Sequence, residues 1–440
     1  MRVTPLALCV ATTVSFMCSN LARADEVERG RDLFKRVWKI EEGLGPLHNA
    51  KSCVACHDQG GTGGAGGRIA DVDVLTMVNS RKSDFWSDAG FTSKRSVVLH
   101  RSSTESDYAR RRFSLLGIES PGGAPCDELP RNSKAFRKMS SKEQKLRKRG
   151  HVVSLKRPGS QLELARRNTT ALFGLALVDE ISVQEIQRAA QATHRKHPQL
   201  SGRFTGRFGW RGQTMSLHEF VVEACENEIG ITTKEARSPE TIKALKLGEE
   251  MNVANDLTAF IAALPRPRRV LPNSQFNRNM IQNGEKTFET IGCSACHLPT
   301  LGGVTEFYSD LLVHDMGPDL VDSAVAPKRL PTGPVGTKHS EGLEPVPESA
   351  RREWKTPALW GCADSAPYLH DGRASTLNEA ILMHGGEAII SVVAYRRLDK
   401  ASQQRLVGFL RTLKGPDREK LGRITGDFQG GQATMSFGHW

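Results

Sequence analysis

The sequence predicts a mainly α-helical protein of two similar halves, with long loops and a basic insertion in the first half. One observation is a five-residue pattern, C-x-x-C-H, that occurs once in each half, at Cys53–His57 and at Cys293–His297. A second is a glycine turn followed by a helix-capping tetrad, also present in both halves. A third is that alternating apolar and polar runs, the mark of half-buried strands, are few. We therefore expect no extended sheet.

The first element along the chain is an export signal. Arg2 precedes a mostly apolar run at residues 6–17, and Ala-Arg-Ala at residues 22–24 fits an A-x-A cleavage site. We therefore expect residues 1–24 to be removed from a protein that works in the periplasm or is otherwise exported. The run is shorter than the roughly 20 apolar residues of a membrane span, and no later segment approaches that length, so we expect no membrane span.

The C-x-x-C-H pattern is the attachment signature of c-type haem. Two thiols one short turn apart can each form a thioether to one porphyrin edge, and the adjacent histidine then reaches the iron as its proximal ligand. A four-cysteine zinc site or a redox dithiol would leave the histidine unexplained. We therefore expect two covalently attached c-type haems, held by Cys53, Cys56, Cys293 and Cys296, with iron bound by His57 and His297.

The other cysteines do not form a disulfide framework. Of nine cysteines, two precede residue 24 and four belong to the haem motifs. Cys126, Cys225 and Cys362 remain, and an odd number cannot all pair within one chain. We expect each to be a small buried side chain.

Positive charge is concentrated in one insertion. The formal net charge is +12, and residues 131–167 hold thirteen Lys or Arg against two acids, Glu143 and Glu163. Such a run is typical of a solvated or partly disordered surface, and it could also attract an acidic partner. Nucleic acid is not an expected partner of an exported haem protein.

A second repeat follows the haem motifs. G-W-R-G-Q at residues 209–213 aligns with L-H-D-G-R at residues 369–373. Capping tetrads begin soon afterwards at Ser216 and Thr376, and each predicts the start of a helix. The two helices have matching inward stripes at i, i+3, i+4 and i+7, namely Leu217, Phe220, Val221 and Ala224 in the first half and Leu377, Ala380, Ile381 and His384 in the second.

The remaining elements keep the same order in both halves. Residues 168–174 are similar to residues 355–361. Apolar periodicity predicts a short helix before each haem motif and an amphipathic closing helix, at residues 27–38, 284–291 and 402–413. We expect two domains, an N-terminal haem domain at residues 25–270 and a C-terminal, cytochrome-c-like haem domain at residues 271–440.

Taken together, the two C-x-x-C-H motifs and the segment A-P-Y-L-H-D-G-R at residues 366–373 resemble the bacterial di-haem cytochrome c peroxidases and their relatives in methylamine utilisation. Further segments are more specifically similar to the di-haem oxidoreductase family of peroxidase-like proteins, at residues 43–47, 167–169, 208–213, 314–318 and 383–387. The resemblance covers most of the mature chain and implies two cytochrome-c-like haem domains.

The resemblance assigns roles to the second half. In the peroxidases, electrons arrive at the C-terminal haem, whose second axial ligand is a methionine fourteen residues after the histidine of the Y-x-H-D-G turn. Counting from His370 reaches His384, which the helix stripe already places on a buried face. Two other interpretations remain open: His384 could be a core histidine bonded to a backbone carbonyl, or Met383 could be the ligand. A histidine in place of methionine would lower the haem potential, because methionine ligation raises it.

The resemblance also assigns a reactive site to the first half, where the peroxidases react with peroxide. The stripe position there is Ala224, which cannot bind iron. His100 could be a removable ligand, although a plain surface or core histidine is the simpler interpretation.

Two catalytic candidates follow from the same family. Trp210 occupies the position of the family's tryptophan between the haems. The positions of its catalytic glutamate and glutamine hold Gly230 and Phe220 here. Glu228 lies two residues short of the glutamate position and is our candidate acid, whereas Phe220 cannot replace a glutamine.

The function implied is that of an exported di-haem c-type oxidoreductase of peroxidase type. Electrons from a small redox protein or other donor would arrive at the His297 haem, cross near Trp210 and reduce an oxidant such as hydrogen peroxide at the His57 haem. The donor would be acidic if the basic insertion attracts it. The alternatives are a pure electron-transfer cytochrome without peroxide turnover, and oxidation of a partner protein.

Overall fold

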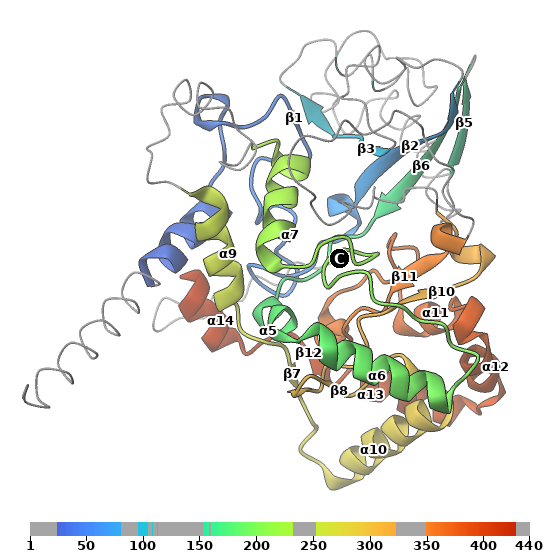
Figure 1. The fold of residues 1–440 in the computed structure, drawn as a ribbon. Helices are drawn as coiled ribbons and strands as arrows, with labels where there is room; N and C mark the ends of the chain where they lie inside the picture. Colours follow the sequence, from blue (N-terminus) through green and yellow to red (C-terminus); the bar gives the residue numbers. More distant parts are fainter. Residues whose placement is uncertain are drawn as a thin grey trace, which may run out of the picture.

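Helices joined by long loops make up most of the protein, as the sequence predicts (Figure 1). The computed structural model describes residues 24–80, 96–103, 108, 112, 153–157, 160–231, 252–322 and 349–427. The predicted signal peptide, Cys126 and the basic insertion up to residue 152 lie outside these residues. Among the described residues, no helix is both long and apolar enough to cross a bilayer.

The helices of the first half surround the first C-x-x-C-H motif. A helix runs through residues 24–35 directly before the motif, close to the predicted bounds. The other helical elements of this half are the 3-10 turns η1 (Ile40–Glu42) and η2 (Arg68–Ala70), the α-helices α5 (Leu175–Glu180), α6 (Val183–Lys196), α7 (Leu217–Ala224) and α9 (Val253–Ala263), and η3 (Cys225–Ile229), a π-helical turn that continues α7.

The second half is also helical. The predicted helix before the second motif is the end of the longer α10 (Gln275–Thr290), and the predicted closing helix is α13 (Lys400–Leu410). However, α13 is not the last helix of the described chain, because one more helix follows it. The remaining elements are α11 (Leu377–Leu382), α12 (Ile389–Arg397), α14 (Arg418–Thr425) and the 3-10 turns η5 (Cys293–Ala295), η6 (Pro318–Leu320), η7 (Ser349–Arg351), η8 (Cys362–Asp364) and η9 (Gly386–Ala388).

The expectation of no extended sheet is wrong for the first half. A four-stranded antiparallel sheet has the order β3-β2-β6-β5 and consists of β2 (Val72–Ser80), β3 (Ser96–Val98), β5 (Val153–Arg157) and β6 (Ser160–Arg167). The acid Asp73 interrupts the apolar pattern of β2, but it is buried as the ion-pair partner of Arg166 and Arg112, at 3.5 Å from each. Because the compensating charges lie far away in the sequence, the pattern of β2 alone does not reveal a strand.

The same sheet changes the interpretation of the basic insertion. Its last residues, 160–167, form strand β6 rather than a solvated surface. Arg166 pairs with Asp73, and Arg167 pairs with Asp322 of the second half. These two arginines therefore hold the fold together.

The described residues also form four short antiparallel pairs, three of which connect segments that are distant in the sequence. The pair of β10 (Val313–Asp315) and β11 (Glu353–Lys355) faces the interior, with Val313 opposite Lys355. The other pairs are β1 (Leu47–His48) with β4 (Ser102–Ser103), β7 (Arg268–Arg269) with β12 (Leu413–Lys414), and β8 (Thr300–Leu301) with β9 (Val304–Thr305).

The predicted repeat has matching backbone geometry in the two halves. Gly212 and Gly372 have positive φ angles of 62° and 66°, which glycine adopts without strain. Each glycine amide donates to the carbonyl three residues earlier at 3.2 Å. The hydroxyls of Ser216 and Thr376 then cap α7 and α11 by accepting from the amide three residues later. The capped helices predicted from the sequence are confirmed.

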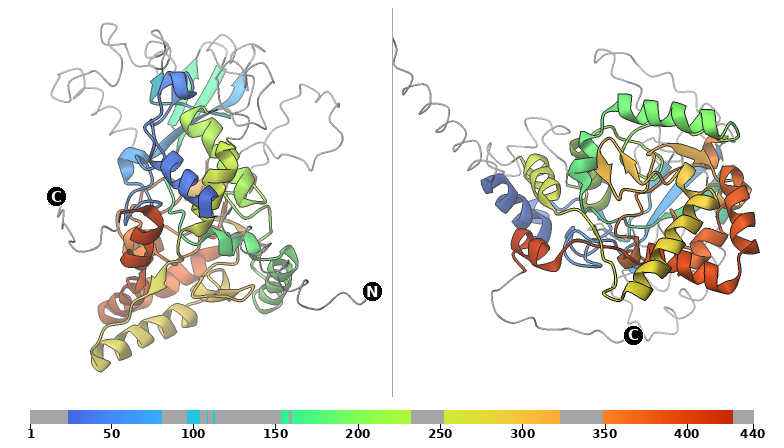
Figure 2. Two further views of the ribbon diagram at one scale, coloured as in Figure 1. Left: turned by 90° about the vertical axis from the view of Figure 1, so that its left-hand side faces the viewer. Right: turned by 90° about the horizontal axis from the view of Figure 1, so that it is seen from below.

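Two apolar cores support these elements. The larger core gathers the helix at residues 24–35, α7 and α9 together with residues of the loop at 301–312, and the smaller one gathers α10 and α13. Helix α14 returns to the larger core, where Leu421 is buried and Lys35 donates to the carbonyl of Thr425. Figures 1 and 2 show α14 beside the N-terminal helix and α9.

We predict that α10 and α13 pack too closely at one point to accept a side chain. A Cβ on Gly284 would lie 2.0 Å from the carbonyl oxygen of Arg405. Gly284→Ala should therefore lower the free energy of unfolding by about 1–3 kcal/mol through overpacking, measured by urea titration with far-UV circular dichroism.

The matched control is Gly408→Ala on α13, where the nearest atom to a new Cβ is 3.4 Å away. It should be neutral or stabilise the protein by up to about 1 kcal/mol, because alanine is the better helix former. Equal unfolding midpoints for the two variants would contradict the predicted overpacking between α10 and α13 at Gly284.

Candidate haem-binding cavity

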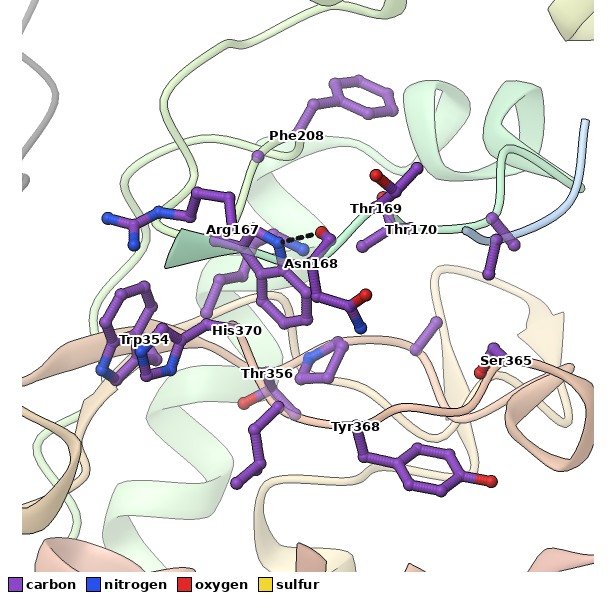
Figure 3. Close-up of a pocket in the computed structure, with 18 of the residues that line it drawn as sticks. Arg167, Asn168, Thr169, Thr170, Phe208, Trp354, Thr356, Ser365, Tyr368 and His370 are labelled. Atoms are coloured by element: carbon purple, nitrogen blue, oxygen red, sulfur yellow. Dashed lines mark hydrogen bonds between the residues drawn. The ribbon is translucent and has the colours of Figure 1, made fainter. Parts of the chain in front are cut away.

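Both C-x-x-C-H motifs open into one continuous cavity of about 1390 Å³. Ligand pockets usually measure about 300–1,000 Å³, so this one is large enough for more than a single small ligand. Its walls come from both halves: the sheet contributes Val72, Val74 and Val98, and α11 contributes Ala380 and Ile381. Figure 3 shows part of the lining, where residues 167–170 of the first half face the segment around Tyr368 and His370.

The first motif presents a neutral imidazole to the cavity. Its single turn is closed by the amide of His57 donating to the carbonyl of Cys53 at 3.0 Å. The Nδ1 atom of His57 lies 3.2 Å from the carbonyl oxygen of Gly64, and Phe34 lies beside the ring, with centroids 6.3 Å apart. Burial lowers the pKa of His57 to about 4. The N–H at Nδ1 therefore donates a hydrogen bond to a backbone carbonyl, so the lone pair of Nε2 remains available for a metal.

The second motif repeats this arrangement. The amide of His297 donates to the carbonyl of Cys293 at 3.0 Å, and Nδ1 of His297 lies 3.0 Å from the carbonyl oxygen of Tyr308. Phe288 takes the place of Phe34, with its ring centroid 6.2 Å from that of His297. Burial again lowers the pKa of His297 to about 4. A metal-binding histidine commonly donates its other N–H to a carbonyl in this way.

The thiols of the motifs fit covalent attachment of haem. All six cysteines of the described part of the chain are free, and the four in the motifs line the cavity. Each motif therefore places two thiols, and one imidazole whose Nε2 is available for a metal, in the same cavity. This is the donor set that c-type haem requires. Cys225 and Cys362 are buried, as predicted.

His384 faces the second motif. It follows the end of α11, lines the cavity, and has its ring centroid 6.5 Å from that of His297. A metal–imidazole bond is about 2 Å long, so two imidazoles on opposite sides of one metal place their ring centres roughly 6 Å apart. The Nδ1 atom lies 2.7 Å from the carbonyl oxygen of Ala380, which again leaves Nε2 available. Burial lowers the pKa of His384, while the neighbouring Met383 is 38% exposed.

The equivalent position in the first half offers no ligand. Ala224 lines the cavity but has no donor atom. His100 also lines the cavity, yet its Nε2 atom lies 2.8 Å from the carbonyl oxygen of Asn227. Burial lowers the pKa of His100 to about 4. His100 is thus a buried neutral histidine bonded to the backbone of η3.

Glu228 reaches the cavity from the π-helical turn η3. Its Oε2 atom accepts a hydrogen bond from Nδ2 of Asn49 at 2.7 Å. Burial raises the pKa of Glu228. Burial also raises the pKa of the Cys56 thiol, with a smaller contribution from the charge of Glu228, which places the carboxyl near the first motif. π-helical turns often occur at functional sites. Phe220 lines the same cavity and stacks on Phe208, with centroids 5.8 Å apart.

Trp210 connects the halves. Its indole N–H donates to the carbonyl of Asn168 at 2.9 Å, the bond drawn in Figure 3, and its own carbonyl accepts from the amide of Lys355 at 2.9 Å. Asn168 in turn donates its backbone amide to the carbonyl of His370 at 2.7 Å. The tryptophan is therefore fixed between segments of both halves, along the cavity wall.

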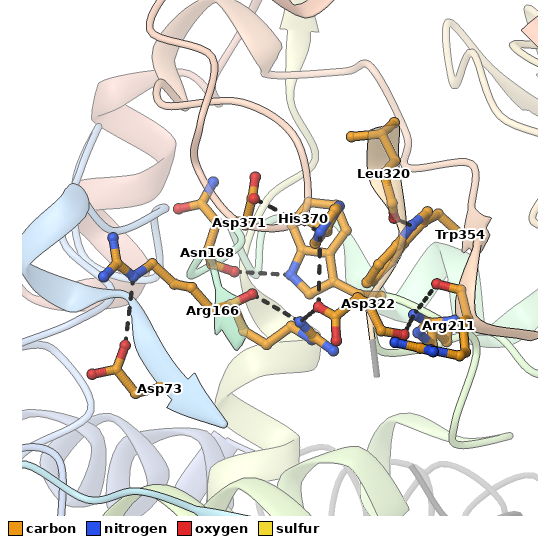
Figure 4. Close-up of polar contacts among 12 residues, drawn as sticks. Asp73, Arg166, Asn168, Arg211, Leu320, Asp322, Trp354, His370 and Asp371 are labelled. Atoms are coloured by element: carbon orange, nitrogen blue, oxygen red, sulfur yellow. Dashed lines mark hydrogen bonds and ion pairs between the residues drawn. The ribbon is translucent and has the colours of Figure 1, made fainter. Parts of the chain in front are cut away.

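A stacked column of side chains beside Trp210 was not predicted from the sequence. The rings of Trp354 and His370 are nearly parallel, 9° apart, with centroids separated by 3.6 Å. The guanidinium carbon of Arg211 lies 3.9 Å from the Trp354 ring centre, and that guanidinium donates to backbone carbonyls, including that of Asp322. Figure 4 shows these groups with the ion pair of Arg166 and Asp73 nearby. Arg211 and His370 lie in the turns that are repeated in the two halves. That repeat was the feature of the sequence that could have identified them.

A buried charge network near the second motif was also missed. His314 lies between two carboxylates, with Nε2 at 2.9 Å from Asp310 and Nδ1 at 2.7 Å from Glu387. The hydrogen bonds of His314 with Asp310, Cys296 and Glu387 raise its pKa to about 12, against the lowering effect of burial. Cys296, Asp310 and His314 lie close enough to hold a metal ion. However, a doubly protonated imidazole has no lone pair to give, so the charge network is the better interpretation.

We predict that His314→Gln destabilises the holoprotein by about 3–5 kcal/mol near pH 6, because it removes one partner from a buried charge network. The raised pKa of His314 gives a contribution that is complete below its ordinary 6.5 and is lost as pH rises toward about 12. The lowered pKa of Glu387 gives a contribution that is complete above its ordinary 4.5 and is lost as pH falls toward about 2. The destabilisation should therefore be largest between pH 4.5 and 6.5.

Urea unfolding at acid, neutral and alkaline pH tests this expectation. His100→Gln is the control, because Nε2 of His100 lies 2.8 Å from a backbone carbonyl oxygen, that of Asn227. A destabilisation by His314→Gln that is the same at every pH would contradict the charge network.

The chain is similar to a known protein family over part of its length. Residues 238–413 match the family described as "Di-haem oxidoreductase, putative peroxidase". Among solved structures, a chain of hydrazine synthase from Kuenenia stuttgartiensis, pressurised with xenon, is 20% identical with a TM-score of 0.33, over 60% of this chain and 76% of that chain. A MauG-like protein associated with microbial copper homeostasis is 17% identical with a TM-score of 0.32, over 49% of this chain and 74% of that one. No curated protein matches. This match confirms, over residues 238–413, the resemblance to the di-haem oxidoreductase family that the motifs predicted.

Proposed function

We propose that this protein is an exported, periplasmic di-haem c-type oxidoreductase of peroxidase type. Electrons from a small redox protein or other donor would pass from the C-terminal site to an oxidant, such as hydrogen peroxide, at the N-terminal site. The observation that carries the proposal is the single cavity onto which two equivalent C-x-x-C-H turns open, each with an imidazole whose Nδ1 is bonded to a backbone carbonyl.

The proposed ligands follow from that geometry. Cys53 and Cys56 would hold one haem and Cys293 and Cys296 the other, with Nε2 of His57 and of His297 on the irons. When bound, haem supplies the one-electron chemistry that side chains lack. His384 is the proposed second ligand at the C-terminal site, since its ring faces His297 at a separation suited to two ligands of one metal. Such a closed site would exchange electrons without binding a small molecule.

The first half is the proposed reactive site. Ala224 leaves the position equivalent to His384 without a donor atom, so a small oxidant could approach there. Glu228 would move the protons that reduction of an oxidant requires, because burial brings its pKa toward the working pH. Asn49, which donates to Oε2 of Glu228, would orient that carboxyl. Trp210, hydrogen-bonded to both halves, would fix the wall between the two sites.

A second function is favoured by one observation. The family's glutamine position is Phe220, and its ring stacks on Phe208 to form an apolar surface in the first half of the cavity. An apolar surface offers no hydrogen bond to a bound oxidant. A di-haem electron carrier without turnover, or an oxidant of a partner protein, would be compatible with such a wall.

We predict that His384→Met raises the midpoint potential of the C-terminal haem, because methionine ligation raises haem potentials. His384→Ala should convert that haem from low spin to high spin. The measurements are a potentiometric titration and the electronic spectrum of the oxidised protein.

Met383→Leu is the control for these changes, because this neighbouring side chain is 38% exposed. It should leave both the spectrum and the potentials as in the wild type. If neither His384 variant changes the spectrum, then His384 is not a ligand of the haem.

We predict that Glu228→Gln reduces peroxide turnover about a hundredfold, the usual size of a general acid–base contribution. The reason is that glutamine keeps the hydrogen-bonding shape but cannot transfer the proton. Stopped-flow assays with a small electron donor measure the rate, and unchanged haem spectra would show that the site is intact.

Glu226→Gln, an exposed change in the same π-helical turn, should keep the wild-type rate. Carbon monoxide binding to the reduced wild type separates the two functions. Binding at one haem together with peroxide turnover supports the peroxidase, whereas two inert low-spin haems would favour the electron carrier.

A further inference from the structure

Lys355 is a cation in the cavity wall. It ends strand β11 beside Trp354, and because side chains alternate along a strand, the two side chains leave on opposite faces. Trp354 packs into the stacked column with His370, whereas the side chain of Lys355 lines the cavity. Lys355 is half-buried, and burial lowers its pKa to about 8.

Two neighbouring cations have carboxylate partners. Around the same strand pair, Arg203 pairs with Glu353, and Arg352 pairs with Asp315 at 2.9 Å. Lys355 has no such partner: among the described residues, no carboxylate or other acceptor lies within hydrogen-bonding distance of its ammonium group. An ammonium group in a half-buried cavity wall is costly when it has no counter-charge, so we expect a binding partner for it inside the cavity.

The nearest candidate acid is already engaged. Asp310 raises the pKa of Lys355, so it lies within electrostatic range. Its Oδ1 atom accepts from the amide of Leu312 at 2.9 Å, and its Oδ2 atom bonds His314 at 2.9 Å. In the strand pair, Lys355 lies opposite Val313, and the next residue, His314, has its Nδ1 atom 3.9 Å from Sγ of Cys296. Lys355 therefore lies close to the His297 part of the cavity, and its counter-charge has to come from whatever fills that part.

We propose that Lys355 binds a propionate carboxylate of the haem held by His297. The inference rests on the proposed function, which places a haem there, and adds the residue that neutralises one of its two carboxylates. A charge-assisted hydrogen bond between ammonium and carboxylate would satisfy both groups inside the cavity. It would also add a positive charge close to the haem, which favours the reduced state.

The test compares Lys355→Met and Lys355→Arg with wild-type holoprotein. Resonance Raman spectra of the reduced protein report hydrogen bonding to the propionates through their bending band, and potentiometry reports the midpoint potential of each haem. In Lys355→Met, the propionate band should shift and the potential of the His297 haem should fall. Lys355→Arg should keep both near the wild-type values, because arginine retains the charge. In the potentiometric titration, the His297 haem is identified as the one whose midpoint potential changes in His384→Met.

Lys414→Met is the matched control, since Lys414 pairs with Asp364 and its side chain is 44% exposed. It should change neither readout. Haem-loaded Lys355→Met with wild-type propionate bands and potentials would overturn the inference, as would a change at the His57 haem alone. Failure of the wild type to hold haem at Cys293 and Cys296 would instead overturn the proposed function. Thermal unfolding by circular dichroism checks that each variant is folded. If Lys355→Met is not folded, Lys355→Arg can still be compared with the wild type.

Discussion

Two hydrogen bonds, from Nδ1 of His57 and of His297 to backbone carbonyls, are the constraint on which the site depends. Each bond selects the tautomer in which Nε2 carries a lone pair and fixes the direction in which that lone pair points. Burial keeps both rings neutral at physiological pH, because it lowers each pKa to about 4. The phenylalanine beside each ring comes from the helix that precedes the motif, so the helices are needed to hold the imidazoles in place.

Duplication explains how two such sites share one cavity. The glycine turns at Gly212 and Gly372 bring the segments carrying Trp210 and His370 to the same interior wall. At the position of the proposed second ligand the two halves differ, because Ala224 stands in place of His384. In our proposal this difference separates a site that accepts electrons from a site that binds an oxidant. The fold could thus obtain two functions from one repeated unit by keeping or removing one ligand.

The sequence was informative where structure is local. The C-x-x-C-H turns, the capped helices α7 and α11, and the alignment of Ala224 with His384 all depend on residues within about one or two helical turns of each other. The sheet was missed because the alternation in β2 is interrupted by Asp73, which is stabilised by Arg166 from a distant strand. The network of His314 with Asp310 and Glu387 was missed for the same reason, since Glu387 is brought in by the fold. Lys355 has no recognisable sequence signal, because an absent partner can be seen only when the surroundings are known.

The measurement that tests the central claim most directly is the number of covalently bound haems per mature chain. Intact-mass spectrometry of the exported protein, combined with a pyridine haemochrome assay, gives that number. Our account predicts two haems in the wild type, one in the double variant Cys53→Ala with Cys56→Ala, and one in Cys293→Ala with Cys296→Ala. A wild-type chain without covalent haem, or a double variant that keeps both haems, would contradict it.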